Sequence, residues 1–139
     1  MKVLMVYPKY PDTFWSFKHA LRFISKKAAI PPLGLITVSS MLPAEWKKRL
    51  IDMNTQELTD ADILWADYVF ISAMYVQKES VDKVLDKCIS LGIPIVAGGP
   101  LFTQDYENYP QIDHFVLNEA EITLEPFLKA IKQGVKPER

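Results

Sequence analysis

Five short apolar runs recur along the chain, separated by stretches of mixed polarity. Most of the runs are continuously apolar and do not alternate with polar residues. Such runs are typical of strands that are covered on both faces, as in a parallel sheet. The predicted strands span residues 3–7, 49–53, 68–74, 94–97 and 114–117.

Helical patterns fill most of the stretches between the strands, with apolar residues at intervals of three and four. The two clearest patterns are followed by Gly92 and Gly134, and a glycine commonly ends a helix. The predicted helices span residues 35–42, 81–89, 103–109 and 122–131.

Several residues indicate where these helices begin. Pro31 and Pro32 precede the first helix, a place where proline is tolerated because its missing N–H needs no partner there. Thr103 and Thr123 are candidate N-caps, since a threonine hydroxyl can accept a hydrogen bond from a backbone N–H at the start of a helix. Pro126 then falls in the first turn of the last helix.

The predicted elements alternate between strand and helix, with one loop over 54–66. This order predicts an α/β fold: a flavodoxin-like or Rossmann-like, doubly wound, five-stranded, mainly parallel sheet with helices on both faces. Right-handed crossovers favour the strand order 2-1-3-4-5. Residues 1–134 are expected to form one domain and residues 135–139 to begin a linker. The long connections over 8–30 and 54–66 are of a length that is often functional.

Composition excludes several classes of protein. The 16 basic and 17 acidic residues give a net charge of -1, so there is no electrostatic case for nucleic-acid binding. The only cysteine, Cys88, can form neither an internal disulfide nor a cysteine-rich metal site, and its place in a helical pattern indicates a packed thiol. No apolar stretch is long enough for a membrane span or a signal peptide, so we expect a soluble, cytoplasmic protein.

Familiar catalytic patterns are also missing from the sequence. There is no G-x-G-x-x-G and no G-x-x-x-x-G-K-[ST], which argues against a dinucleotide site and a P-loop. The acidic set of a phosphate-accepting receiver domain is absent. The two histidines, His19 and His114, are too few and too far apart to indicate a metal cluster, so we predict no metal site and no catalytic residue.

Ligands in this fold class bind beyond the carboxyl ends of the strands, so the residues after each strand are the candidates. The third predicted strand ends in Ser72, Ala73 and Met74. The two small residues allow a ligand to approach the backbone, and the Ser72 hydroxyl can both donate and accept a hydrogen bond. A tight strand-to-helix turn is the alternative interpretation.

The fourth strand ends in Gly98, Gly99 and Pro100, and glycines here leave room for a bulky group. We therefore expect Gly99→Val to abolish ligand binding while the domain stays folded. If Gly99 only makes a turn, the same change lowers stability instead. After the fifth strand, Glu119 is a better ligand candidate than Glu121, whose position the helix dipole already explains.

Taken in order and spacing, these segments resemble the cobalamin-binding domain that precedes many radical SAM domains, in particular the subgroup that includes hopanoid methylases. The resemblance covers nearly the whole chain. It is carried by residues 3–8, 30–35, 50–54, 68–74, 98–100 and 118–121. The family usually reads Gly-Glu-x-Glu where this chain has Asn118 and Glu119, and asparagine tolerates a left-handed turn better than most residues.

The resemblance implies that cobalamin binds across the strand ends. It implies contacts near Pro8, Gly34, Ser72, Ala73, Met74, Gly98, Gly99, Pro100, Thr103, Asn118 and Glu119. The Asp-x-His-x-x-Gly signature of another cobalamin-binding class is absent, so no histidine is offered to cobalt and a base-off cofactor is implied. Aromatic side chains such as Tyr10 and Trp15 would cover the corrin, although the group 14–17 would equally suit packing against a partner domain.

The Cys-x3-Cys-x2-Cys signature of a radical SAM domain is also absent, so the 4Fe-4S cluster and S-adenosylmethionine are implied only for a further part of a longer parent. The implied partners are therefore a radical SAM domain of the same parent and a small-molecule cofactor. This chain alone is expected to catalyse nothing. The alternative is a vestigial domain that binds no cofactor and serves docking or substrate access.

Overall fold

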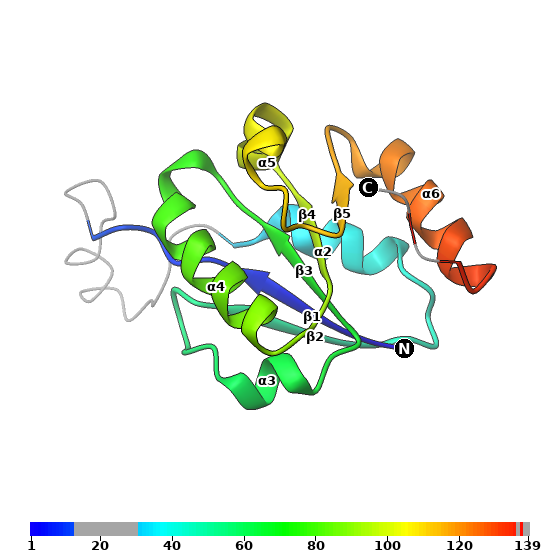
Figure 1. The fold of residues 1–139 in the computed structure, drawn as a ribbon, viewed down its shortest axis with the longest axis horizontal. Coiled ribbons are helices and arrows are strands. Elements are labelled where there is room, and N and C mark those ends of the chain that lie inside the picture. Colours follow the sequence, from blue (N-terminus) through cyan, green and yellow to red (C-terminus); the bar gives the residue numbers. More distant parts are fainter. Residues whose placement is uncertain (13–30, 136, 138–139) are drawn as a thin grey trace.

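A parallel sheet of five strands forms the centre of the computed structural model, which describes residues 1–12, 31–135 and 137. The strand order is β2-β1-β3-β4-β5, and every neighbouring pair is parallel, as predicted (Figure 1). The strands are β1 (Lys2–Tyr7), β2 (Lys47–Asp52), β3 (Tyr68–Ser72), β4 (Ile95–Gly98) and β5 (His114–Val116).

Helices connect consecutive strands. Those described are α2 (Leu33–Met41), α3 (Asp60–Leu64), α4 (Lys78–Ser90), α5 (Pro100–Asp105) and α6 (Ala120–Lys132), with short 3-10 helices η2 (Tyr75–Gln77) and η3 (Tyr106–Asn108). The patterns that predicted α2, α4 and α6 are confirmed. Gly92 and Gly134 follow α4 and α6 with φ of 69° and 68°, the left-handed conformation that glycine adopts without strain.

Two predicted N-caps are wrong. Thr103 lies inside α5, which begins at Pro100 after an N-cap at Gly99, so the helix predicted over 103–109 starts earlier and ends as η3. Pro100 at the first helical position was the better signal, because proline is favoured there. Thr123 is the fourth residue of α6, whose N-cap is Glu119.

The Thr123 hydroxyl donates to the Glu119 carbonyl oxygen at 3.1 Å, a hydrogen bond inside the first turn rather than a cap. Pro126 is correspondingly the seventh residue of α6 and not part of its first turn. It has no N–H to give to the carbonyl four residues earlier, and helix packing against the sheet compensates for that loss.

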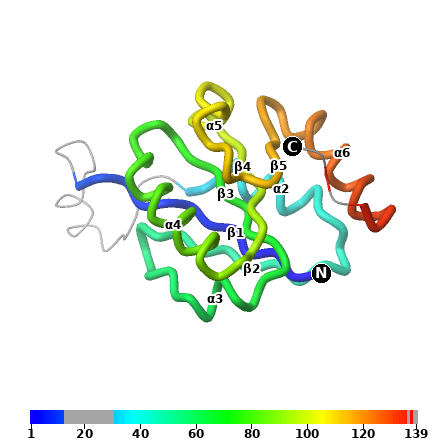
Figure 2. The backbone as a smooth tube through the Cα atoms, in the orientation of Figure 1, coloured from blue at the N-terminus to red at the C-terminus, as the bar shows by residue number. Residues whose placement is uncertain are grey.

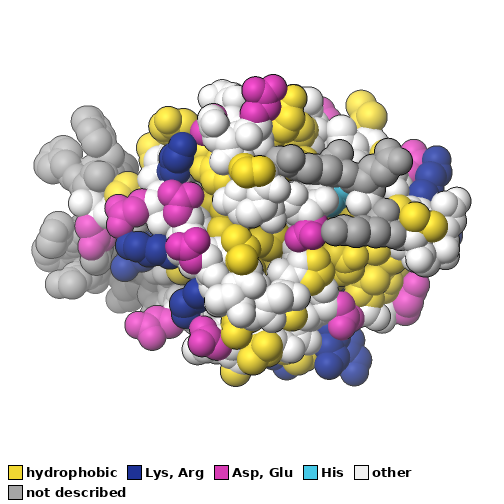
Figure 3. Space-filling model, viewed as in Figure 1, with side chains coloured by type: hydrophobic (Ala, Val, Ile, Leu, Met, Phe, Trp, Pro, Cys, Tyr) yellow, Lys and Arg dark blue, Asp and Glu magenta, His cyan; other side chains and the backbone are white. Residues whose placement is uncertain are grey.

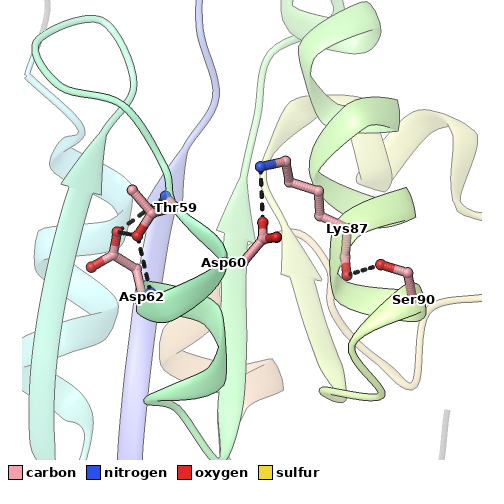
Figure 4. Close-up of polar contacts among 5 residues, drawn as sticks. All are labelled: Thr59, Asp60, Asp62, Lys87 and Ser90. Atoms are coloured by element: carbon pink, nitrogen blue, oxygen red, sulfur yellow. Dashed lines mark hydrogen bonds and ion pairs between the residues drawn. The ribbon is translucent and has the colours of Figure 1, made fainter.

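Helix α3 lies within the stretch predicted as a loop. Its N-cap Thr59 forms a capping box with Asp62: the Asp62 N–H donates to the Thr59 hydroxyl oxygen at 3.3 Å, and the Thr59 N–H donates to the Asp62 carboxylate at 3.1 Å (Figure 4). The hydrogen bond from the Thr59 side chain lowers the pKa of Asp62. An ion pair of 3.1 Å between Asp60 and Lys87 joins α3 to the last turn of α4.

Side chains of alternating strand positions enter two separate cores, one on each face of the sheet. The first core lies under α3, α4 and α5 and includes Leu4, Val6, Ile63, Val69, Ile71, Val81, Leu85, Ile95, Leu101 and Phe102. The second lies under α2 and α6 and includes Val3, Met5, Tyr7, Leu35, Phe70, Val96, Val116, Leu124 and Phe127. Figures 1 and 2 show α4 in front of the sheet and α2 behind it. Burial on both faces explains why β1, β3, β4 and β5 read as continuous apolar runs, whereas the edge strand β2 carries three basic residues and is largely exposed.

Cys88 is fully buried in the first core, as predicted, and burial raises the pKa of its thiol from 9.0 to about 11. Within the described ranges, no helix combines the length and the apolar composition needed to cross a membrane. Acidic and basic side chains are interspersed over the face drawn in Figure 3, in keeping with the small net charge.

Candidate functional site at the carboxyl ends of the strands

A pocket of about 240 Å3 lies at the carboxyl ends of β3, β4 and β5. It is on the face that α2 and α6 cover, because residues within 34–38 of α2 and the first turn of α6 line it together with the strand ends. Six of the predicted ligand-binding residues line this pocket: Gly34, Ser72, Gly98, Gly99, Asn118 and Glu119. The topology therefore brings together residues from four separate segments of the chain.

The Ser72 hydroxyl is the polar group at the centre of this arrangement. It would lie 2.6 Å from a Cβ placed on Gly99 and 3.8 Å from one placed on Gly34, so it sits between the two glycine backbones. Ser72 is one of the residues that line the pocket. It is placed to donate to, or accept from, a ligand.

Gly98 and Gly99 are also required by the fold itself. A Cβ on Gly98 would lie 2.6 Å from the Val116 carbonyl oxygen. Gly99 has φ of 89°, and its Cβ would lie 3.1 Å from the backbone N and O of Ala73. The space beside Gly99 is thus filled by protein atoms, which corrects the expectation that Gly99→Val leaves the domain folded. The turn interpretation accounts for Gly99, while its backbone still lines the pocket.

The turn between β5 and α6 forms another wall of the pocket. Asn118 has φ of 57°, a left-handed conformation that asparagine tolerates. Its N–H donates to the Thr103 hydroxyl oxygen at 3.1 Å, so Thr103 holds the turn against α5 and does not itself line the pocket. Glu119 and Glu121 are exposed at the rim, where their carboxylates can accept hydrogen bonds from a ligand.

Four other predicted residues lie nearby but outside the pocket lining. Ala73 is buried, and its N–H donates to the Gly98 carbonyl oxygen at 3.3 Å, which joins the ends of β3 and β4. Pro100 is exposed at the start of α5. Pro8 is buried after β1, whereas Met74 is 44% exposed after β3.

Two amide side chains fix the end of β1, and sequence reasoning did not single out either of them as functional. The Pro8 carbonyl oxygen accepts from Gln77 Nε2 and from Asn54 Nδ2, the latter at 3.3 Å. Asn54 Oδ1 accepts from the Tyr10 N–H at 2.9 Å, and Gln77 Oε1 accepts from the Met74 N–H at 2.8 Å. Gln77 is only 1% exposed. No local pattern signals these contacts, because the partners lie up to 69 residues apart.

The predicted aromatic group at residues 14–17 and His19 lie outside the described residues. His114 opens β5 and is buried against the ring of Phe127, with ring centroids 5.2 Å apart. It is the register partner of Val96 in β4, and it is not part of the pocket lining.

A family model described as the B12 binding domain matches residues 22–128. The chain belongs to the B12-binding domain family. The five-stranded parallel sheet agrees with this assignment, and a pocket at the carboxyl ends of the strands is where ligands bind in such folds.

Curated relatives of this B12-binding domain are methyltransferases by name. An uncharacterized methyltransferase of Synechocystis is 38% identical over 136 residues, covering 96% of this chain and 25% of the relative. Hopanoid C-2 methylase of Rhodopseudomonas palustris is 30% identical over 140 residues, covering 99% of this chain and 27% of the relative. An uncharacterized methyltransferase of Pyrococcus horikoshii is 31% identical over 148 residues, covering 96% and 31%.

The B12-binding domain thus spans about a quarter to a third of the length of these relatives. No solved structure matches the chain.

The pocket of this B12-binding domain fits one part of cobalamin. Its volume of about 240 Å3 is below the roughly 300–1,000 Å3 of pockets that enclose a drug-sized ligand, and cobalamin is larger than such ligands. The glycine backbone and the Ser72 hydroxyl suit a flat group with a polar atom. Part of cobalamin could enter such a pocket, and the rest would remain outside it.

Proposed function

We propose that this chain holds cobalamin for a larger radical SAM enzyme of the methyltransferase type. The observation that carries the proposal is the pocket at the carboxyl ends of β3, β4 and β5, in a chain of the B12-binding family. The nucleotide tail enters that pocket, with the Ser72 hydroxyl hydrogen-bonded to it and the backbone of Gly98 and Gly99 against its flat face. When bound, cobalamin supplies a transferable methyl group.

Cobalamin would be held base-off, without the described histidine, His114, on cobalt. A tail that occupies the pocket cannot at the same time coordinate cobalt. His114 is unsuited as a replacement, because it is buried at the amino end of β5. The role of the residues that line the pocket would therefore be to bind and orient the cofactor.

The chemistry belongs to the rest of a longer parent. The methyltransferase names of relatives three to four times as long support a further domain that binds S-adenosylmethionine and a 4Fe-4S cluster. That domain is the partner of this one and covers the outer face of the corrin. A cytoplasmic location suits the single, buried, unoxidised thiol of Cys88.

Titration with hydroxocobalamin, followed by absorbance, tests the proposal. The chain should bind, and Ser72→Ala should weaken binding about fivefold, the usual size of one lost hydrogen bond. Ser90→Ala is the matched control. Ser90 is the last residue of α4 and does not line the pocket, and its hydroxyl donates to the Lys87 carbonyl oxygen at 2.8 Å. Loss of this hydroxyl should leave the affinity for cobalamin unchanged. An unaltered absorbance spectrum at saturating cobalamin would instead favour a docking domain without cofactor.

Electron paramagnetic resonance of bound cob(II)alamin tests the base-off state separately. The spectrum should lack the splitting that an axial nitrogen produces. A resolved nitrogen splitting would show that the tail or a histidine coordinates cobalt, contrary to the proposal.

A further inference from the structure

A short chain of hydroxyl contacts runs from the end of β1 to the turn after β3. The hydroxyl oxygens of Tyr7 and Tyr10 are 2.7 Å apart, and the Tyr10 hydroxyl donates to the Met74 sulfur at 3.2 Å. A thioether accepts a hydrogen bond but never donates one, so the hydroxyl proton of Tyr10 points toward the Met74 sulfur. The Tyr10 oxygen must then accept a hydrogen bond from the Tyr7 hydroxyl, so both hydrogen bonds run in the same direction, from Tyr7 to Tyr10 to Met74.

Contacts of its backbone and of its ring hold Tyr10 in this position. Its N–H donates to Asn54 Oδ1 at 2.9 Å. Its ring packs edge-on against that of Tyr7, with centroids 5.9 Å apart. Tyr7 is itself only 6% exposed, and burial, followed by the hydrogen bond to Tyr10, raises the pKa of its phenol, which keeps its proton in place.

Met74 is the movable member of this series of hydrogen-bonded side chains. Its N–H is fixed by Gln77 Oε1 at 2.8 Å, but its side chain is 44% exposed. Methionine is flexible, and its sulfur is a weak hydrogen-bond acceptor. A carbonyl oxygen brought to this edge by a ligand would be the stronger acceptor for the Tyr10 hydroxyl, and the Met74 side chain can turn aside.

We infer that Tyr10 is a further cofactor-binding residue: its hydroxyl donates to a peripheral amide carbonyl of the corrin and, in doing so, exchanges its hydrogen bond with the Met74 sulfur for this one. This rests on the proposed function. The inference also accounts for the size of the pocket. The Tyr10 hydroxyl contacts Met74, two residues after Ser72 of the pocket lining, so a corrin that the pocket cannot hold would meet Tyr10 if it extended past the end of β3. Tyr7 and Asn54 act through Tyr10 and are positioning residues.

The test compares two probes, hydroxocobalamin and cobinamide, which keeps the corrin amides but lacks the nucleotide tail. Tyr10→Phe removes the hydroxyl alone and should weaken binding of both probes about fivefold. Ser72→Ala should weaken cobalamin only. Tyr106→Phe is the matched control, since Tyr106 is an exposed tyrosine of α5–η3 whose hydroxyl is 3.5 Å from Glu107. The thermal midpoint, measured alongside, should be unchanged in Tyr10→Phe to within a few degrees.

Met74→Leu separates the hydroxyl from the sulfur. It keeps the apolar bulk and removes the competing acceptor, so both probes should bind at least as tightly as to the unchanged chain. A loss equal to that of Tyr10→Phe would show that the sulfur makes the contact and would overturn the inference.

Two further outcomes distinguish the inference from the function on which it rests. Equal affinities of the unchanged chain and Tyr10→Phe for both probes would overturn the role of Tyr10 and leave the cobalamin pocket standing. Failure of the unchanged chain to bind either probe would overturn both.

Discussion

Gly92 and Gly99 share a left-handed backbone but differ in their surroundings. Their φ values are 69° and 89°. A Cβ on Gly92 would meet no atom within 4 Å, whereas one on Gly99 would lie 2.6 Å from the Ser72 Oγ and 3.1 Å from backbone atoms of Ala73. The two positions therefore separate the cost of a strained φ from the cost of crowding.

We predict that Gly92→Ala costs about 1 kcal/mol of unfolding free energy, from backbone strain alone. Gly99→Ala should cost clearly more, because the backbone of Ala73 cannot move aside as a flexible side chain does. Urea unfolding of both variants measures the difference. Equal losses would show that the end of β3 yields to the added methyl group.

Cys88 should behave as an inert thiol. With a pKa of about 11, only about one molecule in a thousand carries a thiolate at pH 8. Because the thiol is fully buried, a disulfide reagent at pH 8 should modify the native protein far more slowly than the protein in urea, where the thiol is exposed. Equal rates in the native and the urea-unfolded protein would contradict the burial of this thiol.

At the scale of elements, two threonines show why a cap is hard to locate from sequence. Thr59 caps the short helix α3 through a reciprocal pair of contacts with Asp62. Thr123, which looks equally suitable, lies one turn inside α6 and donates to the Glu119 carbonyl oxygen. The choice depends on where each helix starts, and packing of the helix on the sheet decides that.

Thr59→Ala should lower the unfolding free energy by about 1 kcal/mol, because the Asp62 N–H loses its acceptor and the Asp62 carboxylate loses one donor, the Thr59 hydroxyl. Thr123→Ala should change it by less than about 0.5 kcal/mol, since alanine is the better helix former. The lowered pKa of Asp62 makes this effect depend on pH. The contribution of the Asp62 carboxylate to the unfolding free energy is present above about pH 4 and is lost as the pH falls through the folded-state pKa. A loss from Thr59→Ala that persists undiminished at pH 2 would contradict the role of the carboxylate.

At the scale of the whole molecule, the sheet separates a core that supports the pocket from one that does not. Leu124 of α6 belongs to the second core, under the face with the pocket, and Leu85 of α4 belongs to the first. Both leucines are at most 1% exposed. The first turn of α6 lines the pocket, whereas no residue of α4 does.

Leu124→Ala and Leu85→Ala should each cost about 2–5 kcal/mol, the usual cost of a cavity in a core. Only Leu124→Ala should weaken hydroxocobalamin binding, because α6 lines the pocket and α4 does not. Both affinities are measured at a temperature where circular dichroism shows the two variants folded. Equal weakening would show that the two faces are coupled through the sheet.

The sequence by itself determined the architecture. Strands covered on both faces must be apolar at every position, and amphipathic helices must repeat at intervals of three and four, so local patterns predicted the five strands, α2, α4 and α6. The chirality of crossovers then led to the order β2-β1-β3-β4-β5. The strand-end residues followed from the rule that parallel strands place their carboxyl ends at one edge.

Only the tertiary structure decided the contacts between those strand ends. Helix α3 is five residues long, too short for a periodic pattern, and it forms because Ile63 packs into the first core. The Pro8 carbonyl oxygen and Gln77 are 69 residues apart, and Asn118 and Thr103 are 15 apart. A buried amide or a hydroxyl looks the same in sequence whether its partner is a neighbour, water or a distant turn. The fold alone brings such groups within hydrogen-bond distance, and that is why the polar contacts around the pocket appear only in three dimensions.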